Sequence, residues 1–116
     1  MPERMDRDFL SDIQEAIRRI REYTAGMTYQ AFLEDTKTQD AVIRNIEIIG
    51  EATKNLSKDL RERHPHVLWK GMAGVRDRLI HHYFGVNIDI VWHIVTDELL
   101  TVASQLERIL QEEGDA

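Results

Sequence analysis

Apolar residues recur at steps of three and four positions along most of this chain, which is the spacing of one face of an α-helix. The pattern predicts a first helix from about Asp6 to Tyr23 and a last helix from about Ile88 to Glu112, with Asn87 as its N-cap. Glycine and proline are scarce, with six and two residues in a chain of 116. The sequence therefore predicts an all-α protein.

Two further helices are predicted between these. A short one covers Tyr29 to Glu34, and a long one runs from about Thr38 to Arg63. His64-Pro65 ends the long helix, because a residue before proline avoids helical geometry. Gly50 in the middle of this helix costs about 1 kcal/mol relative to alanine, and the close approach of another helix would explain its presence.

The stretch from Pro65 to Gly74 is predicted to be an irregular connection, and a fourth helix is predicted to begin near Gly71–Gly74. Short connections make successive helices antiparallel neighbours, so we expect an up-and-down bundle of about four to five helices. A chain of 116 residues is long enough for one hydrophobic core. Residues 1–116 are therefore predicted to form a single domain.

Charge is distributed unevenly along the sequence. The formal net charge of −6 disfavours a protein that coats nucleic acid with its whole surface. Between Lys58 and His82, however, six lysines and arginines outnumber three acids, and four of the five histidines lie there. This segment favours a confined anion site, although solvated helix faces would give the same charge pattern over residues 58–70.

Other features predict a soluble, cytoplasmic protein. The chain has no cysteine, which excludes disulfides and thiolate metal sites. Its first residues lack the apolar core of a secretion signal, and no apolar run approaches the roughly 18–20 residues that span a bilayer. We therefore expect no association with membranes.

The segment richest in reactive side chains is the octet Arg76-Asp77-Arg78-Leu79-Ile80-His81-His82-Tyr83. On an ideal helix Arg76 and Tyr83 lie within about 20° of each other, whereas His81 lies about 140° from Arg76. One straight helix therefore does not bring the three side chains together. Either the helix frays or kinks near residues 80–83, or a second copy of the chain completes the site across a two-fold axis, which we favour.

An arginine and a histidine suffice to cleave RNA through its own 2′-hydroxyl group. Histidine, with a pKa of about 6.5, exchanges protons with the reacting oxygens, and the guanidinium fork stabilises charge on the phosphate. The products are a 2′,3′-cyclic phosphate and a 5′-hydroxyl, with no metal or other cofactor. Tyr83 could bind phosphate or stack on a base, and Asp77 could orient a catalytic side chain or support Arg78. The competing interpretation is that these arginines are surface charges and that the histidines only favour a helix C-terminus.

Two further features have simpler structural explanations. His64-Pro65-His66 places two histidines on a proline-containing loop without cysteine or carboxylate neighbours, so no metal site is expected. Trp69 and Trp92 are expected to anchor packing rather than to stack on bases.

The octet and its flanks, residues 71–86, resemble the signature of HEPN-domain toxins of the HepT type. Three other segments resemble that family in the same order along the chain. Arg44 to Ala52 resembles its central helix, His64-Pro65 through Trp69-Lys70 its connection to the motif helix, and Val91 to Val95 the start of its last helix. The Arg–x4–His spacing alone is weak, but these segments together cover nearly the whole chain.

The resemblance implies a HEPN-like helical bundle that forms a homodimer and acts on RNA as a metal-independent endoribonuclease. It implies that Arg76 and His81 are the catalytic pair. It also implies that the protein is the toxin of a type VII-like toxin–antitoxin module. The partner would be a minimal nucleotidyltransferase, which neutralises the toxin by adding AMP to Tyr83.

Three positions bear on how closely the chain follows the family. Asp77 stands where the family often has a polar residue, and Glu51 matches a family position with a packing or supporting role. His82 replaces a residue that is usually small or variable, although the spacing of the motif is intact. The alternative function is that of a non-catalytic dimeric module, which binds a nucleotidyltransferase and helps to present its nucleotide or substrate.

Overall fold

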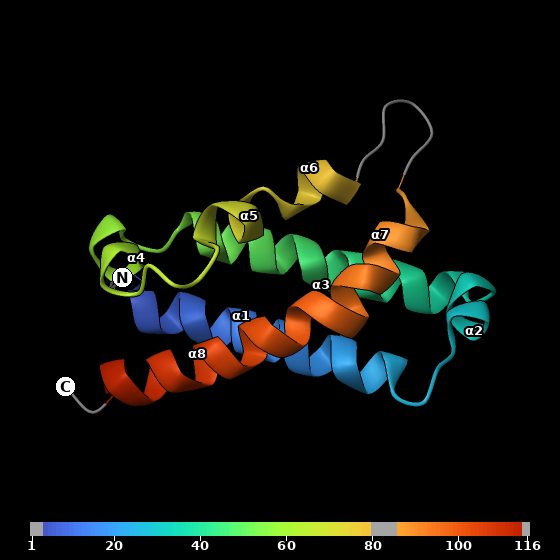
Figure 1. The fold of residues 1–116 in the computed structure, drawn as a ribbon, viewed down its shortest axis with the longest axis horizontal. Coiled ribbons are helices and arrows are strands. Elements are labelled where there is room, and N and C mark those ends of the chain that lie inside the picture. The colour runs from blue at the N-terminus through green and yellow to red at the C-terminus, as the bar shows by residue number, and fades with distance from the viewer. Residues whose placement is uncertain (1–3, 80–85, 115–116) are drawn as a thin grey trace.

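The computed structural model describes residues 4–79 and 86–114, and every regular element within them is a helix (Figure 1). The elements are α1 (Asp6–Thr24), α2 (Tyr29–Leu33), α3 (Thr36–Lys54), α4 (Lys58–Arg63), α5 (Trp69–Ala73), α6 (Val75–Leu79), α7 (Ile88–His93), the π-helical turn η1 (Ile94–Glu98) and α8 (Leu99–Gly114). The prediction of an all-α protein is confirmed. No helix among the described residues is long and apolar enough to cross a membrane.

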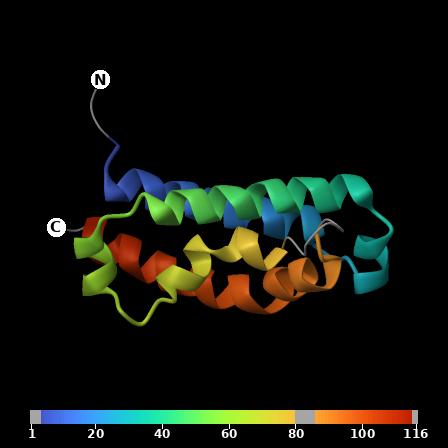
Figure 2. The ribbon, with the colours of Figure 1, turned by 90° about the horizontal axis from the view of Figure 1, so that it is seen from above.

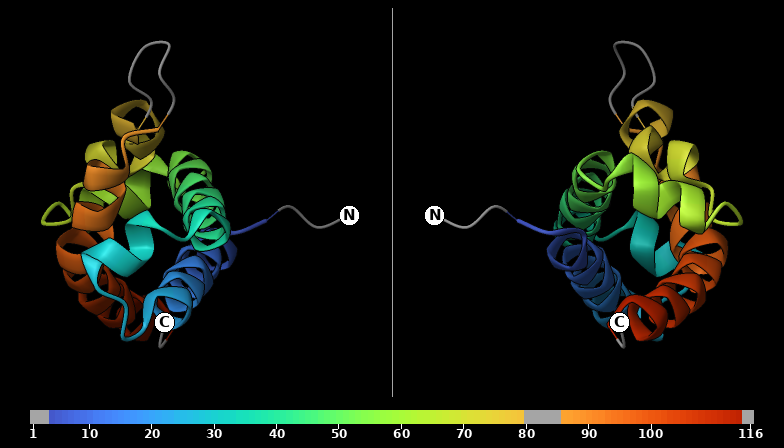
Figure 3. Two further views of the ribbon diagram at one scale, coloured as in Figure 1. Left: turned by 90° about the vertical axis from the view of Figure 1, so that its right-hand side faces the viewer. Right: turned by 90° about the vertical axis from the view of Figure 1, so that its left-hand side faces the viewer.

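Helix α1 lies along α3 in the antiparallel direction, and α8 crosses the other side of α1 (Figures 1 and 2). The predicted apolar stripe of α1 faces this core, since Ile13, Ala16, Ile17 and Ile20 are buried, and Leu10, which was not predicted, is buried with them. Phe9, at the edge of the stripe, is half-buried and packs against the core. Viewed along the long axis, α1, α3, the α5–α6 segment and the last helix surround the buried side chains, and α2 crosses one end (Figure 3).

The prediction of one long helix from Thr38 to Arg63 is wrong, because α3 ends at Lys54 and a separate helix, α4, begins at Lys58. The hydroxyl of Ser57 accepts the amide of Leu60 over 3.1 Å and so starts a new helix. The amide and hydroxyl of Ser57 also donate to the Asp6 carboxylate over 2.8 and 2.6 Å. These bonds replace those of a continuous helix and join the start of α4 to the start of α1.

The connection after Pro65 is more helical than predicted, since α5 already begins at Trp69. Gly74 separates α5 from α6, and both short helices lie along α3 (Figure 2). The expected close approach at Gly50 is confirmed. A Cβ atom built on Gly50 would lie 3.4 Å from Cγ1 of Val75 and 3.5 Å from the carbonyl oxygen of Met72. Any side chain larger than alanine at this position would push the α5–α6 segment away from α3.

The last helix follows its prediction from Ile88 onward, with one irregularity. Asn87 caps it as expected, because its side-chain oxygen accepts the amide of Ile90 over 3.2 Å. Residues Ile94–Glu98 form a π-helical turn between α7 and α8. Such a turn holds one extra residue, so every later side chain rotates around the helix axis by about 100° relative to a regular helix.

Both tryptophans serve packing, as predicted. Trp69 is 7% exposed, and its indole N–H donates to the carbonyl oxygen of His64 over 2.9 Å. The ring of Trp92 lies with its centroid 5.0 Å from that of Phe32 and 6.1 Å from that of Tyr29. This aromatic group joins α2 to α7 at one end of the molecule.

Candidate functional site

Helix α6 carries the first half of the predicted motif. Val75 and Leu79 are buried on its inner side, with 6% and 0% of their surfaces exposed, whereas Arg76 and Asp77 are exposed. Residues four positions apart share a helix face, so the two buried residues turn the Arg76 side of α6 toward solvent. Three predicted site residues lie outside the described part of the chain: His81, His82 and Tyr83.

The described residues on the two sides of this segment are joined directly. The amide of Asn87 donates to the carbonyl oxygen of Leu79 over 2.9 Å. Since Asn87 is also the N-cap of α7, this bond holds the start of the last helix beside the end of α6. The two described ends of the chain on either side of residues 80–85 are therefore bonded to each other.

Arg78 forms a bidentate ion pair with Glu98 of the π-helical turn. Its Nη1 atom lies 2.8 Å from Oε1 and its Nη2 atom 2.8 Å from Oε2. The hydrogen bond from Arg78 lowers the pKa of the Glu98 carboxyl below its ordinary value of 4.5, and the carboxylate raises the pKa of Arg78. The carboxylate partner of Arg78 is therefore Glu98 rather than its neighbour Asp77. No sequence signal identifies Glu98, because it lies 20 positions away on another helix.

A histidine extends this ion pair along the last helix. The Nδ1 atom of His93 lies 2.8 Å from the carboxylate of Asp97, and its Nε2 atom lies 3.7 Å from that of Glu98. His93 and Asp97 are both exposed, so solvent screens their interaction. The pair between Arg78 and Glu98 is the tighter contact, since it has two parallel hydrogen bonds.

An apolar groove of about 390 Å³ lies between the α5–α6 segment and the last helix. Its floor includes Met72, Val75 and Ile94, and the Arg78–Glu98 pair forms part of its wall. The ion pair thus borders apolar surface on one side and solvent on the other. Arg76, by contrast, does not line the groove, and among the described residues Arg78 rather than Arg76 forms an ion pair on α6.

The chemistry available on α6 therefore differs between its two arginines. The guanidinium of Arg78 directs two N–H groups at Glu98, which neutralises its charge locally. Arg76 is exposed and keeps a planar set of donors for an anion such as a phosphate. Among the described residues of the motif, Arg76 is an exposed arginine for which no ion pair with another described residue is seen.

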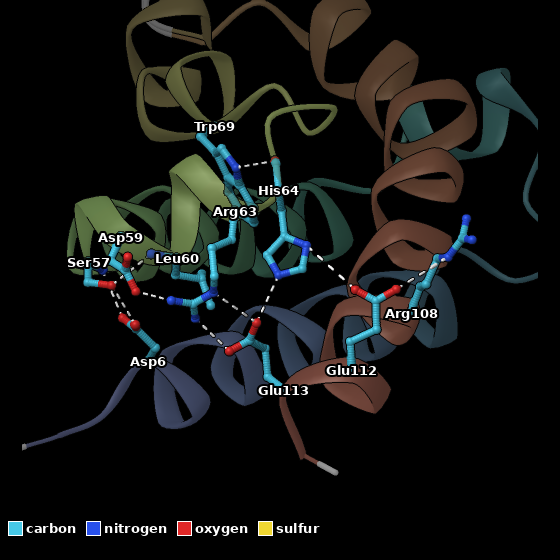
Figure 4. A network of polar contacts seen from close by, with 10 residues as sticks. All are labelled: Asp6, Ser57, Asp59, Leu60, Arg63, His64, Trp69, Arg108, Glu112 and Glu113. Carbon is cyan, nitrogen blue, oxygen red and sulfur yellow. Dashed lines mark hydrogen bonds and ion pairs between the residues drawn. The ribbon is translucent and has the colours of Figure 1, made fainter. Parts of the chain in front are cut away.

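A second polar network lies at the far end of the molecule, around His64 (Figure 4). The His64 side chain is 7% exposed, and its Nε2 atom lies 2.9 Å from the Glu113 carboxylate. Arg63 donates to the same carboxylate over 2.6 Å. The sequence interpretation missed the carboxylates beside His64, those of Glu112 and Glu113, which come from the end of α8. Among the described residues, no group of three or more histidines and carboxylates has an arrangement that could hold a metal ion.

This network predicts a loss of stability in acid. The hydrogen bonds from His64 and Arg63 lower the pKa of Glu113 below its ordinary value of 4.5. A carboxyl group whose pKa is lowered by folding stabilises the fold fully above its ordinary pKa, and this stabilisation disappears as the pH falls through the lowered pKa. We expect Glu113→Gln to lower the free energy of unfolding by about 1 kcal/mol at pH 7. The loss should become smaller as the pH falls below the ordinary pKa of the Glu113 carboxyl group.

Urea denaturation at a series of pH values measures this effect. Glu107→Gln is the matched control, because Glu107 is an exposed residue of the same helix and does not belong to the His64 network. An equal loss of stability in both variants, or a loss in Glu113→Gln that does not shrink in acid, would contradict the assignment.

The chain is similar to a known protein family and to several named relatives. The family described as "Ribonuclease HepT-like" matches residues 13–112. A relative from Methanocaldococcus jannaschii, named "Putative RNase MJ0127", is 48% identical over 116 residues, which cover 99% of this chain and 96% of the relative.

Two further relatives come from other organisms. "Probable ribonuclease HepT" of Thermococcus cleftensis is 44% identical over 91% of this chain and 96% of its own length. "Putative RNase TTE0752" of Caldanaerobacter subterraneus subsp. tengcongensis is 42% identical over 92% of this chain and 96% of its own length. No solved structure matches the chain significantly. The match covers α6 and nearly the whole fold, and the chain therefore belongs to the HepT-like ribonuclease family.

Proposed function

We propose that this protein is a toxin that cleaves RNA without a metal ion, with Arg76 and His81 as its catalytic residues. The observation that carries the proposal is the position of Arg76, which is exposed on a helix whose other face is buried and whose end is bonded to the last helix. Membership of a ribonuclease family and the names of the relatives support the same activity.

The proposed reaction is a transfer of the phosphate to the neighbouring 2′-oxygen. The 2′-oxygen attacks phosphorus while a histidine takes the 2′-hydroxyl proton, and the bond from phosphorus to the 5′-oxygen breaks. A second histidine, which is protonated, gives its proton to the leaving 5′-oxygen. The products are therefore a 2′,3′-cyclic phosphate and a 5′-hydroxyl. Arg76 stabilises the added negative charge on the two non-bridging oxygens. We assign Asp77, Arg78 and His82 to the surroundings of this site.

The need for a base and an acid supports a homodimer in which two chains share one cleft. Two copies supply two His81 and two Arg76 side chains to one substrate. The separation of about 140° between Arg76 and His81 on an ideal helix supports the same arrangement. The apolar groove beside α6 offers surface for such an interface close to the motif.

The direct test is incubation of the purified chain with total RNA in excess EDTA. We expect cleavage to continue at an unchanged rate, with 2′,3′-cyclic phosphate on the new 3′ ends and free hydroxyls on the new 5′ ends. A chelator stops ribonucleases whose nucleophile is a metal-bound water, so the result separates the two mechanisms. No cleavage by a chain of confirmed unmodified mass would favour a non-catalytic module that binds a nucleotidyltransferase.

We further propose that the protein acts in the cytoplasm as the toxin of a type VII-like module, and that a minimal nucleotidyltransferase neutralises it by adding AMP to Tyr83. Co-expression of the two proteins should then increase the mass of the chain by about 329 Da, because AMP is transferred from ATP to the tyrosine oxygen as a phosphodiester and pyrophosphate leaves. A multiple of this mass would mean that further AMP groups are joined to the first. Intact-mass spectrometry measures the increase. Tyr83→Phe should abolish it, whereas Tyr29→Phe, an exposed tyrosine on α2, should not.

A further inference from the structure

Contacts with the rest of the fold hold the described residues of α6, Val75–Leu79, in place. Those contacts are the burial of Val75 and Leu79, the hydrogen bond from Asn87 to Leu79, and the ion pair of Arg78 with Glu98.

The ion pair adds a directional contact to the buried side chains that orient α6. Buried apolar side chains attract without a preferred direction, whereas a bidentate pair of guanidinium and carboxylate fixes a plane and two distances. Both distances between Arg78 and Glu98 are 2.8 Å. The pair is also better protected than a fully exposed one, since the side chains of Arg78 and Glu98 are 44% and 36% exposed and border the apolar groove.

The π-helical turn determines where Glu98 lies. Ile94 and Val95 of this turn are buried, and so is Leu99 immediately after it. The extra residue of the turn sets the rotation of the helix at Glu98, which brings its carboxylate to α6 while the apolar neighbours stay in the core. An irregularity that interrupts the regular hydrogen bonding of the last helix thus coincides with its contact to the motif helix.

We propose that Glu98 is a positioning residue for RNA cleavage, which holds Arg78 and thereby fixes the direction in which α6 presents Arg76. This inference rests on the proposed function. It separates the roles of two arginines that lie two positions apart: Arg76 contacts the phosphate, and Arg78 anchors the helix. Because one N–H of each Nη atom of Arg78 already donates to a carboxylate, which also neutralises its charge locally, Arg78 is a weaker ligand for a phosphate than Arg76.

Exchange of the two charges tests the proposal. Glu98→Gln keeps the size of the side chain but loses the charge, and we expect it to lower kcat by about 10- to 100-fold while KM changes by less than about threefold, as for misplacement of a reacting group. Arg78→Glu and Glu98→Arg alone should be at least as damaging. The double variant Arg78→Glu with Glu98→Arg restores an ion pair, and we expect it to recover about tenfold or more of kcat over each single variant.

The matched control is the exposed pair of Arg18 and Glu22 on α1, whose exchange should leave kcat unchanged. Two results would overturn the proposal. One is a Glu98→Gln variant with wild-type or higher kcat, which means that Arg78 needs no partner. The other is a folded double variant that is no more active than the single variants, which assigns Arg78 to the substrate.

A second measurement keeps the proposal separate from the function on which it rests. Hydrogen exchange of the α6 amides, at residues 75–79, needs no RNA. We expect faster exchange at these amides in Glu98→Gln than in the wild type, with α1 unchanged. If the wild type cleaves no RNA, the proposed function fails; if α6 exchange is unchanged in Glu98→Gln, the anchoring role of Glu98 fails.

Discussion

Arg76→Ala is expected to lower the rate of RNA cleavage by about 10²–10³-fold, which is the usual loss when one group that stabilises transition-state charge is removed. The physical reason is that the phosphate gains negative charge during attack, and the neutral alanine offers nothing to balance it. Arg76→Lys keeps the charge but loses the planar fork, so we expect intermediate activity. The measurement is kcat/KM on a short RNA in EDTA.

The fold should survive this change. Arg76 is exposed, and exposed substitutions usually alter stability by less than about 0.5 kcal/mol. The control is Arg21→Ala, which removes an exposed arginine from a different helix, α1. This variant should cleave RNA at the wild-type rate. If Arg76→Ala retained activity while remaining folded, Arg76 would not be catalytic.

The same variant tests whether the site is shared between two chains. Arg76→Ala and His81→Ala homodimers should both be inactive. Random mixing makes half of the dimers mixed. In the proposed shared cleft, each mixed dimer keeps one Arg76 and one His81, whereas each variant homodimer lacks both copies of one of these residues. We therefore expect the mixture to cleave RNA faster than either homodimer but more slowly than the wild type, and no recovery would contradict a cleft to which both chains contribute.

Phe32→Ala is expected to destabilise the protein by about 3–5 kcal/mol, the usual loss for a buried phenylalanine. Phe32 has 0% of its surface exposed, and its ring centroid lies 5.0 Å from that of Trp92. Its removal would leave a cavity beneath Trp92 and detach α2 from the start of the last helix. Urea denaturation followed by circular dichroism measures the loss.

The control for this prediction is on the same helix. Leu33 is 42% exposed, so Leu33→Ala should change stability by less than about 0.5 kcal/mol. A loss below about 1 kcal/mol in Phe32→Ala would mean that α2 contributes little to the core. A loss of 3–5 kcal/mol would confirm that Trp92 forms part of a packed cluster, as the sequence predicted.

Local features of the chain were predictable because they depend on neighbours in sequence. Helix formation and capping act over three or four positions, which is why the first helix, Asn87 as an N-cap and the end of α4 before Pro65 all follow from the sequence. Gly50 was informative because a glycine inside a helix needs a reason, and the approach of Val75 provides one. The motif spacing and the family resemblance identified the ribonuclease.

The sequence determined the helices and the segment that carries the motif, whereas the tertiary structure decided which distant side chains meet. Asp6 accepts hydrogen bonds from Ser57, 51 positions away in the sequence, at the point where the predicted long helix is interrupted. Glu98 pairs with Arg78, which lies 20 positions away. No periodicity reports such contacts, because they depend on how the helices pack and on one π-helical turn. The sequence therefore predicted Arg76 as a site residue, whereas only the fold showed that Glu98 pairs with Arg78 on the same helix.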